Sequence, residues 1–215
     1  MATQQTGFDF PMPLAEKYRP RRICDFVGLE KPKKIIGKLA VNPFPSAWLF
    51  VGPSGTGKTT LALALAEAIP AELHHITSQN CTLDNVERVR RTCQYLPLAG
   101  HRFHLVLVDE ADRMTPAAQV SFLSKLDATD FPPNTIFVFT CNSIDGLEKR
   151  FLSRCRPIEF SSYGIAADVT QLLSAIWNAE APADAARPNL ARIVKDATNN
   201  VRDALMNLEV ELMAI

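Results

Sequence analysis

The stretch from Gly52 to Thr59 carries the clearest chemistry in this sequence. It reads Gly-Pro-Ser-Gly-Thr-Gly-Lys-Thr, which matches the pattern G-x-x-x-x-G-K-[ST], and it follows the apolar run Trp48–Val51. Glycines and small residues let backbone N–H groups turn inward around a phosphate chain. A helix that begins after such a loop adds the positive end of its dipole. The stretch is therefore predicted to bind the phosphates of a nucleotide.

Individual side chains of this loop have predicted roles. Lys58 is expected to bring a positive charge to the β- and γ-phosphates, and Thr59 is expected to offer its hydroxyl to Mg²⁺. A glycine-rich turn with a chance lysine is the alternative, which the complete match between a strand pattern and a helix pattern disfavours. The predicted nucleotide-binding residues are Gly52, Pro53, Ser54, Gly55, Thr56, Gly57, Lys58, Thr59 and Thr60.

Two carboxylates follow a second apolar run. Asp109 and Glu110 come directly after Leu105–Val108, a β-branched stretch typical of a central parallel strand. Ligands of α/β proteins bind at the carboxyl ends of such strands, so both side chains are expected near the phosphates. Asp109 is expected to hold Mg²⁺ directly or through water, and Glu110 to activate the attacking water. The simpler alternative is that both residues cap a strand.

Three further polar residues are candidates for contact with the γ-phosphate. Asn142 ends a buried strand pattern and is expected to contact this phosphate or the attacking water, although asparagine is also common in turns. Arg154 follows a short helix pattern and is either a surface charge or an arginine inserted into a neighbouring subunit's site. Arg202 lies on the last helix pattern and either approaches the γ-phosphate or pairs with Asp203 or Glu209.

Composition describes a globular chain without net charge. The chain has 215 residues, of which 47% are hydrophobic and 21% charged, and a formal net charge of +0. Binding to nucleic acid would therefore need a local basic patch. The 5 cysteines are scattered without a C-x-x-C pair, which disfavours zinc. With no secretory signal and no run of roughly 18 apolar residues, we expect a cytoplasmic, nucleoid or nuclear protein without a membrane partner.

Strand and helix patterns alternate through most of the chain. The predicted strands are residues 48–51, 73–77, 105–108, 135–140 and 157–160. This alternation predicts an α/β fold with a mostly parallel, five-stranded sheet between helices. In the helix expected over residues 116–126, Val120, Leu123 and Leu126 are predicted to be buried, with Phe122 at the edge.

Three segments are expected along the chain: a loose N-terminal segment (residues 1–13), an α/β nucleotide-binding domain (14–161) and a small helical lid (162–215). Within the second, residues 14–22 are predicted to be extended because basic residues cluster around an X-Pro step. The lid has about fifty residues, which is few for independent folding, so it is expected to pack near the nucleotide.

Together these stretches resemble an AAA+ ATPase and, more narrowly, the small subunits of sliding-clamp loaders of the replication factor C type. The resemblance extends from about Leu14 to Glu209 and implies the AAA+ P-loop fold, with ATP and Mg²⁺ as ligands. The motifs that carry it are Glu16–Pro20 with Asp25–Gly28, the Walker B stretch Val108–Asp112, Ser153-Arg154-Cys155, and Asn199–Leu205.

The resemblance implies specific roles for some residues. Those that would wrap the base and ribose are Tyr18, Arg19, Pro20 and Val27. Asn142 matches sensor 1, Arg154 would act in trans, and Arg202 lies on the sensor 2 helix. Asn199 and Asn200 depart from the usual glycine and aspartate of that helix.

The resemblance also implies partners: other AAA+ subunits in a ring or spiral, a sliding clamp, and the backbone of primer-template DNA. Arg90, with Arg88 or Arg91, would contact DNA phosphates without reading sequence; a solvated basic helix face is the alternative. Clamp-loader subunits carry a helical collar domain after the lid. This chain stops at Ile215, where that domain should begin, so either the sequence is truncated before the collar or this is a compact relative without one.

The predicted function is ATP hydrolysis at sites between subunits, coupled to opening or loading a sliding clamp on DNA during replication. Two alternatives remain open. A different AAA+ DNA remodeller, such as a helicase loader or fork-maintenance ATPase, would show DNA-stimulated hydrolysis without a clamp. A non-hydrolysing, nucleotide-gated scaffold is disfavoured by the presence of Glu110, Asn142 and Arg154.

Overall fold

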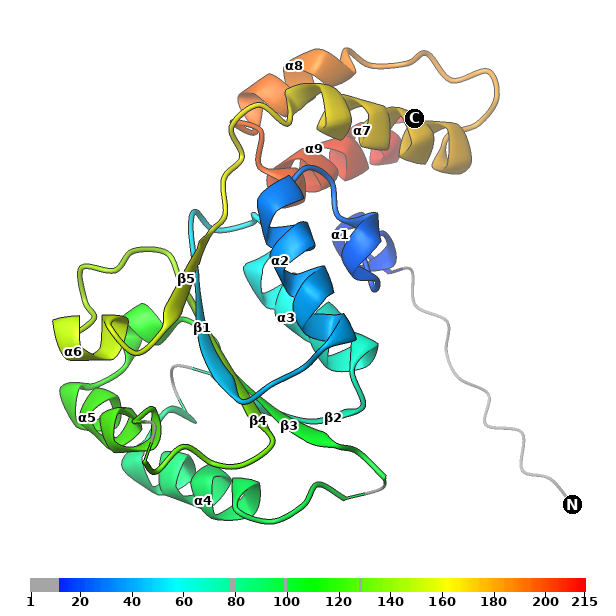
Figure 1. Ribbon diagram of the computed structural model, residues 1–215. Helices are drawn as coiled ribbons and strands as arrows, with labels where there is room; N and C mark the ends of the chain where they lie inside the picture. Colours follow the sequence, from blue (N-terminus) through cyan, green and yellow to red (C-terminus); the bar gives the residue numbers. More distant parts are fainter. Residues whose placement is uncertain (1–11, 78–79, 99, 128) are drawn as a thin grey trace, which may run out of the picture.

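A parallel five-stranded sheet forms the centre of the molecule (Figure 1). The structure is a computed structural model and describes residues 12–77, 80–98, 100–127 and 129–215, so the predicted loose segment lies outside it except for its last two residues. The strands are β1 (Ser46–Val51), β2 (Ala71–Ile76), β3 (Phe103–Val108), β4 (Thr135–Cys141) and β5 (Arg156–Glu159). Their order is β2-β3-β4-β1-β5, and neighbours run parallel. The predicted fold class is confirmed.

Helices cover both faces of this sheet. Helices α2 and α3 lie on one face, and α4, α5 and α6 lie on the other (Figure 1). Their bounds are α2 (Glu30–Val41), α3 (Lys58–Ala68), α4 (Leu83–Cys93), α5 (Pro116–Lys125) and α6 (Lys149–Leu152), with the short 3₁₀ helices η1 (Ile23–Asp25) and η3 (Ala111–Arg113). The hydroxyl of Thr82 caps α4 by accepting from the N–H of Asn85 at 3.4 Å.

Side chains of the central strands alternate between these two faces. On β3, Leu105 and Leu107 pack in the cluster with α2 and α3, whereas Val106 and Val108 pack in the cluster with α4 and α5. All four are fully buried. A strand covered on both faces needs apolar residues at every position, which explains the continuous apolar run in the sequence. Because these strands are buried on both faces, the residues that directly follow them have fixed positions at the edge of the sheet.

Three C-terminal helices form a separate hydrophobic cluster, called the lid below. They are α7 (Ala166–Glu180), α8 (Leu190–Asp196) and α9 (Val201–Met213). Leu14, in the short helix α1 (Leu14–Lys17), is buried in the same cluster, and Tyr18 and Val27 pack against it. Figure 1 shows α1 beside α9, so the N-terminal segment joins the lid. The domain boundary between residues 161 and 162 stays a prediction.

The prediction of an extended segment over residues 14–22 is wrong for its first turn. This turn is α1, closed by backbone hydrogen bonds of 2.9 Å to the carbonyl oxygen of Pro13. Pro20 restricts only the residue before it, so the chain can turn further upstream. Burial of Leu14 among the lid helices then favours the helical turn.

The buried face of α5 is rotated from the predicted one. Val120 is 53% exposed, whereas Phe122, expected at the edge, is 2% exposed. Leu123 and Leu126 are buried as predicted. The ring of Phe122 packs edge-on against that of Phe139, with centroids 5.1 Å apart. An aromatic ring buries more apolar area than valine and gains from this geometry, so the helix turns Phe122 toward the sheet.

No helix within the described residues is long and apolar enough to cross a membrane.

Candidate nucleotide site

The loop between β1 and α3 has a backbone that requires glycine. Gly55 has a φ angle of 74°, and a Cβ there would lie 2.1 Å from Oδ1 of Asn200. Gly52 has a φ angle of 155°, and a Cβ there would lie 2.1 Å from the carbonyl oxygen of Phe160. Neither position has room for a side chain, so the loop can fold closely only with these glycines.

Lys58 is the first residue of α3, and its ammonium group is buried behind the loop. Its Nζ donates to the carbonyl oxygens of Gly52 at 2.6 Å and Pro53 at 2.8 Å, and to Oδ1 of Asn142 at 3.0 Å. Burial lowers the pKa of Lys58, and the nearby charge of Arg202 lowers it further. Neighbouring acidic groups, including Asp109, act in the opposite direction. The fold thus places the side chain of Asn142 against Lys58. Its contact with the γ-phosphate or the attacking water stays a prediction.

The oxygen atoms expected at the Mg²⁺ position lie together at the ends of α3 and β3. The hydroxyl of Thr59 donates to Oδ1 of Asp109 at 2.8 Å. The hydroxyl of Thr140, on β4, donates to the same carboxylate oxygen. A hydroxyl and a carboxylate beside a polar cavity of about 110 Å³ are donors that suit Mg²⁺ together with water. The residues present therefore fit this ion.

Glu110 follows Asp109 in a left-handed backbone conformation. Its φ angle is 54°, which turns the chain sharply from β3 into η3. The N–H of Glu110 donates to the hydroxyl of Thr140 at 3.1 Å, and its carboxylate lies 3.4 Å from the guanidinium of Arg113. Thr140 thus contacts both residues of the predicted acidic pair. Sequence reasoning missed it, although a hydroxyl inside an otherwise apolar strand was the available signal.

Asp112 is a second missed residue of this site. Its Oδ2 accepts from the backbone N–H of Asn142 at 3.2 Å and so fixes the end of β4. Its Oδ1 is buried and has no hydrogen-bond partner among the described residues. Asp112 therefore holds in place the backbone of Asn142, whose side chain contacts Lys58.

Arg202 borders the phosphate loop from α9. It lines the same cavity as Lys58, and no ion pair to Asp203 or Glu209 occurs among the described residues. Glu209 instead accepts from the backbone N–H of Leu14 at 3.0 Å. Two cationic groups thus line one small cavity together with the carboxylates of Asp109 and Glu110, which suits an anionic ligand that binds with a cation.

Asn200 links the lid to the phosphate loop. Its Oδ1 accepts from the backbone N–H of Arg202 at 3.0 Å and of Asp203 at 3.4 Å, which caps α9. Its Nδ2 donates to the carbonyl oxygen of Ser54 at 3.0 Å. Asn199 adopts a φ angle of 60°, a conformation that asparagine tolerates better than most residues. The two asparagines that depart from the family pattern therefore keep the cap and the turn.

A second cavity of about 150 Å³ adjoins the first. The two share Gly55, Gly57, Thr60 and Arg202. All four residues expected to wrap the base line it: Tyr18, Arg19, Pro20 and Val27. Apolar residues to which the sequence assigned no individual role also line it, together with the carboxylates of Glu16 and Asp25: Phe26, Leu29, Leu172, Val201 and Leu205. A partly apolar cavity joined to a polar one that contains both cationic and acidic side chains suits a nucleotide's base, its phosphates and a bound cation.

Glu180, at the end of α7, connects Lys17 and Tyr18 to the lid. The hydroxyl of Tyr18 donates to its Oε1, and Nζ of Lys17 lies 2.7 Å from the same oxygen. This hydrogen bond, with burial, raises the pKa of Tyr18 to about 12. Sequence reasoning gave Glu180 no role because its partners lie far from it in the chain.

Arg154 lies away from this site. It lines neither cavity, and it follows α6, which is on the sheet face opposite α3. Its Nε donates to Oδ1 of Asp127 at 2.8 Å, and its Nη1 donates to the carbonyl oxygen of Arg150 at 2.9 Å. The guanidinium of Arg154 lowers the pKa of Asp127. Its proposed position beside a neighbour's nucleotide stays a prediction.

The arginines expected to contact DNA lie along α4. Arg88 and Arg91 are exposed, while Nε of Arg90 is 2.9 Å from Oε2 of Glu87. Val86, Val89 and Cys93 turn inward from the same helix. The helix therefore presents Arg88 and Arg91 to solvent, and their contact with DNA stays a prediction.

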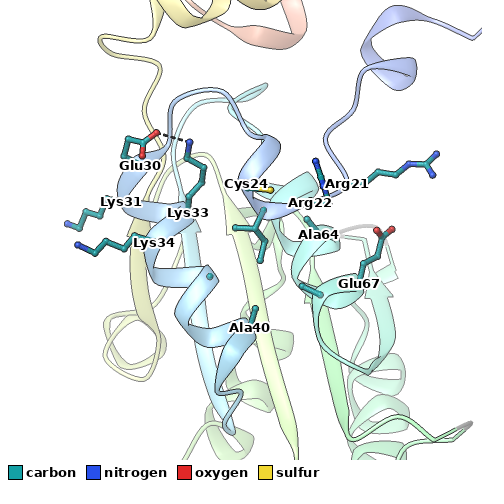
Figure 2. A pocket seen from close by; sticks show the side chains of 13 residues that line it. Arg21, Arg22, Cys24, Glu30, Lys31, Lys33, Lys34, Ala40, Ala64 and Glu67 are labelled. Atoms are coloured by element: carbon teal, nitrogen blue, oxygen red, sulfur yellow. Dashed lines mark ion pairs between the residues drawn. The ribbon is translucent and has the colours of Figure 1, made fainter.

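A wider groove of about 1200 Å³ lies on the opposite face, between α2 and α3. Its basic residues include Arg21, Lys31 and Lys34, whereas Lys33 pairs with Glu30 at 2.7 Å. Figure 2 shows Lys31 and Lys34 extending outward from α2. The charges diverge instead of converging on one point, so this groove lacks the arrangement of a nucleotide site.

Comparisons with known proteins agree with this geometry. The family model for ATPases associated with various cellular activities (AAA) matches residues 48–163, more than half of the chain. Replication factor C small subunit 1 of Pyrobaculum islandicum is 33% identical over 153 residues, which are 68% of this chain and 46% of that protein. Replication factor C small subunit of Thermofilum pendens is 34% identical over 152 residues, 67% of this chain and 46% of that protein. The chain spans about half the length of the curated relatives it matches.

Solved structures show the same fold at lower sequence identity. Two variants of Thermotoga maritima RuvB superpose with TM-scores of 0.72 and 0.73 at 18% identity. The superpositions include 89% and 90% of this chain. They include 64% and 65% of the respective RuvB chains. At this identity the likeness concerns the fold alone.

The bond between Tyr18 and Glu180 makes stability depend on pH in a defined direction. The folded-state pKa of about 12 exceeds the ordinary tyrosine pKa of 10.0, so this bond stabilises the fold fully below pH 10 and its contribution is lost as the pH rises to 12. Glu180→Gln should move one tyrosine titration back toward 10 in ultraviolet absorbance. Glu209→Gln, on α9, is the matched control and should leave it unchanged. A tyrosine titration that is equal in all three proteins would contradict this coupling.

Proposed function

This chain belongs to the AAA family of ATPases, and we propose that it binds and hydrolyses ATP as one subunit of a clamp-loader-like assembly on DNA. One observation carries the proposal. Lys58 and Arg202 place two positive charges around one small cavity, and that cavity joins an apolar one lined by Tyr18 and Val27. ATP combines a tetra-anionic phosphate chain with a flat base and matches both parts. The relationship to replication factor C small subunits supports the assignment to clamp loading.

Thr59 and Asp109 would hold Mg²⁺, which neutralises charge on the β- and γ-phosphate oxygens when bound. Thr140 keeps the Asp109 carboxylate in position through its hydroxyl. All three N–H donors of the Lys58 ammonium are bonded to the loop carbonyl oxygens and Asn142, so the ammonium would exchange at least one of these bonds for a phosphate oxygen. Most of the catalytic benefit proposed for these residues is positioning and charge stabilisation.

Glu110 and Asn142 act on the attacking water. The water oxygen forms a bond to the γ-phosphorus while the bond to the β–γ bridging oxygen breaks, and ADP and phosphate leave. Glu110 accepts the water proton or orients the water through its carboxylate. The amide of Asn142 accepts from Lys58, and Asp112 fixes its backbone, so its remaining amide group could orient this water.

The lid responds to nucleotide through two contacts. Arg202 lines the cavity beside Lys58, where it would contact the γ-phosphate, and Asn200 bonds to Ser54 in the phosphate loop. On the base side, Tyr18 bonds to Glu180 of α7. A nucleotide that contacts both cavities would therefore bias the angle between lid and sheet. We propose that this angle aligns neighbouring subunits around DNA.

The partners remain part of the proposal: further AAA+ subunits, a sliding clamp and a primer-template DNA backbone. Arg154 would complete the neighbour's site after leaving Asp127. A different AAA+ DNA remodeller is distinguished by DNA-stimulated hydrolysis that does not respond to any clamp. A scaffold without turnover is distinguished by the experiment on Glu110 below.

Glu110→Gln should retain ATP binding and lower turnover by about 10²–10⁴-fold, because the amide cannot accept a proton from water. Binding is measured by fluorescence titration with a labelled ATP analogue, and hydrolysis by phosphate release. Glu211→Gln, an exposed carboxylate on α9, is the matched control and should change neither. Unchanged turnover in Glu110→Gln would remove Glu110 from the mechanism.

Mixing two inactive variants tests whether Arg154 acts in trans. Arg154→Ala lacks the arginine, and Lys58→Ala lacks its own phosphate contact, so each alone should lose about 10³-fold or more of the assembly's turnover. Mixed assemblies contain some interfaces with both residues and should recover part of the activity. Arg150→Ala, changed one helical turn earlier, should keep activity. Mixed assembly confirmed by mass without recovery would place Arg154 outside the neighbour's site.

DNA contact is tested by comparing the two basic faces. Reversing charge at Arg88 and Arg91 on α4 should weaken binding of the ATP-bound assembly to primer-template DNA and reduce the salt slope by about 2, because two phosphate contacts are lost. Lys31→Glu with Lys34→Glu, on the opposite face, is the matched control. Fluorescence anisotropy at several salt concentrations measures both. Equal losses in both pairs, or none with the arginine pair, would exclude α4 as the DNA contact.

A further inference from the structure

Two histidines and a cysteine meet at the edge of the sheet, away from the nucleotide. His74 lies on β2, His104 on β3, and Cys93 is the last residue of α4. Their potential ligand atoms all lie within 4.8 Å of one another. Nε2 of His74 is 3.0 Å from Nδ1 of His104. None of the three lines the nucleotide cavities.

The parallel pairing of β2 with β3 explains this meeting. Glu72 pairs with His104 in the register, so His74 lies two positions further along the same face of the sheet. That face is the one covered by α4, whose inward stripe ends at Cys93. Residues 30 positions apart in β2 and β3 thus become neighbours.

His104 is oriented as a ligand by its other ring nitrogen. Its Nε2 lies 2.9 Å from the carbonyl oxygen of Tyr95. A carbonyl oxygen can only accept, so Nε2 carries the proton and Nδ1 presents its lone pair to the cluster. Histidine ligands of metals commonly have this second bond, which fixes the ring and its tautomer. The side chain is 1% exposed, so no alternative partner in solvent competes.

Glu72 supplies a negative charge beside the cluster. Its Oε2 lies 3.7 Å from Nδ1 of His104, and its Oε1 lies 4.0 Å from Nε2 of His74. Its Oε2 also accepts from the backbone N–H of Leu98 at 3.0 Å. A divalent ion bound by one thiolate and two neutral imidazoles would retain one positive charge. The carboxylate would balance that charge, as a partly buried ion requires.

We propose that His74, Cys93 and His104 form a binding site for a divalent transition metal of the Zn²⁺ class, with Glu72 as the neighbouring carboxylate. Mixed imidazole and thiolate donors suit Zn²⁺ and disfavour Mg²⁺ or Ca²⁺, which take oxygen. On binding, the thiol of Cys93 loses its proton to solvent and its sulfur donates an electron pair to the metal. His74 donates through Nε2 with its proton on Nδ1, and His104 donates through Nδ1.

This proposal differs from the expectation that the scattered cysteines disfavour zinc, and the arrangement of the ligands explains why. Zinc sites are usually recognised from ligands a few residues apart, and here each ligand comes from a different element. Bound metal would join β2, β3 and α4 and would brace the segment after α4 through Tyr95 and Leu98. Its role is structural, because it would fix α4 and with it the exposed Arg88 and Arg91.

The direct test is metal binding by the full chain with Cys24→Ser, which removes the exposed cysteine. Zn²⁺ titrated against a chromophoric chelator should bind at one equivalent per chain. Co²⁺ should give a thiolate-to-metal charge-transfer band and the strong visible bands of tetrahedral coordination. Failure to compete with the chelator, or a Co²⁺ spectrum without the thiolate band, would overturn the proposal.

A variant pair separates coordination from folding. His74→Gln keeps an N–H donor for His104 but removes the imidazole lone pair, and should weaken Zn²⁺ binding by more than about 10-fold. Cys81→Ser changes another buried cysteine outside the cluster and should leave Zn²⁺ affinity unchanged. Circular dichroism checks the fold of both. Unchanged affinity in His74→Gln, or an equal loss in Cys81→Ser, would refute the assignment. Metal affinity is read directly, so the result is independent of ATP hydrolysis.

Discussion

The buried ammonium of Lys58 is the constraint on which the site depends. A buried cation is costly unless polar groups surround it, and three oxygens do so here: two from the loop and one from Asn142. The strand order satisfies this requirement, because β4 lies directly beside β1 and ends at the same edge. Since β3 is the next strand, Asp109 arrives beside Thr59 at that edge as well. The need to surround the Lys58 ammonium with oxygen atoms thus brings Asn142 to the loop, and the same strand order brings Asp109 there.

The lid is tied to this centre by hydrogen bonds, and its own core is separate. The lid helices pack mainly with one another and with α1, while Asn200 reaches the phosphate loop and Tyr18 reaches Glu180. Polar contacts of this kind depend more on charge nearby than apolar packing does. Nucleotide charge can therefore alter the lid's attachment without disturbing its hydrophobic cluster. Such an arrangement suits a subunit that converts binding into movement.

Sequence patterns were most informative for segments buried on both faces, where only apolar residues fit. The central strands and the loop from Gly52 to Thr59 needed only local composition and spacing. The rotation of α5 toward Phe122 could not be predicted, because it depends on which aromatic rings β4 offers. Thr140 and Glu180 act through partners 31 and 162 residues away, a separation that no local pattern reports. The orientation of α5 and the partners of Thr140 and Glu180 therefore depend on contacts between elements, which the periodicity of the sequence does not report.

Contacts between residues far apart in the sequence also determine the position of α4. The helix packs beside β2, an edge strand that pairs only with β3 within the described sheet. Its inward stripe consists of Val86, Val89 and Cys93. A metal bound at the end of that stripe would add coordination bonds to this apolar packing. If Arg88 and Arg91 contact DNA as proposed, such a constraint would hold both side chains at a constant angle.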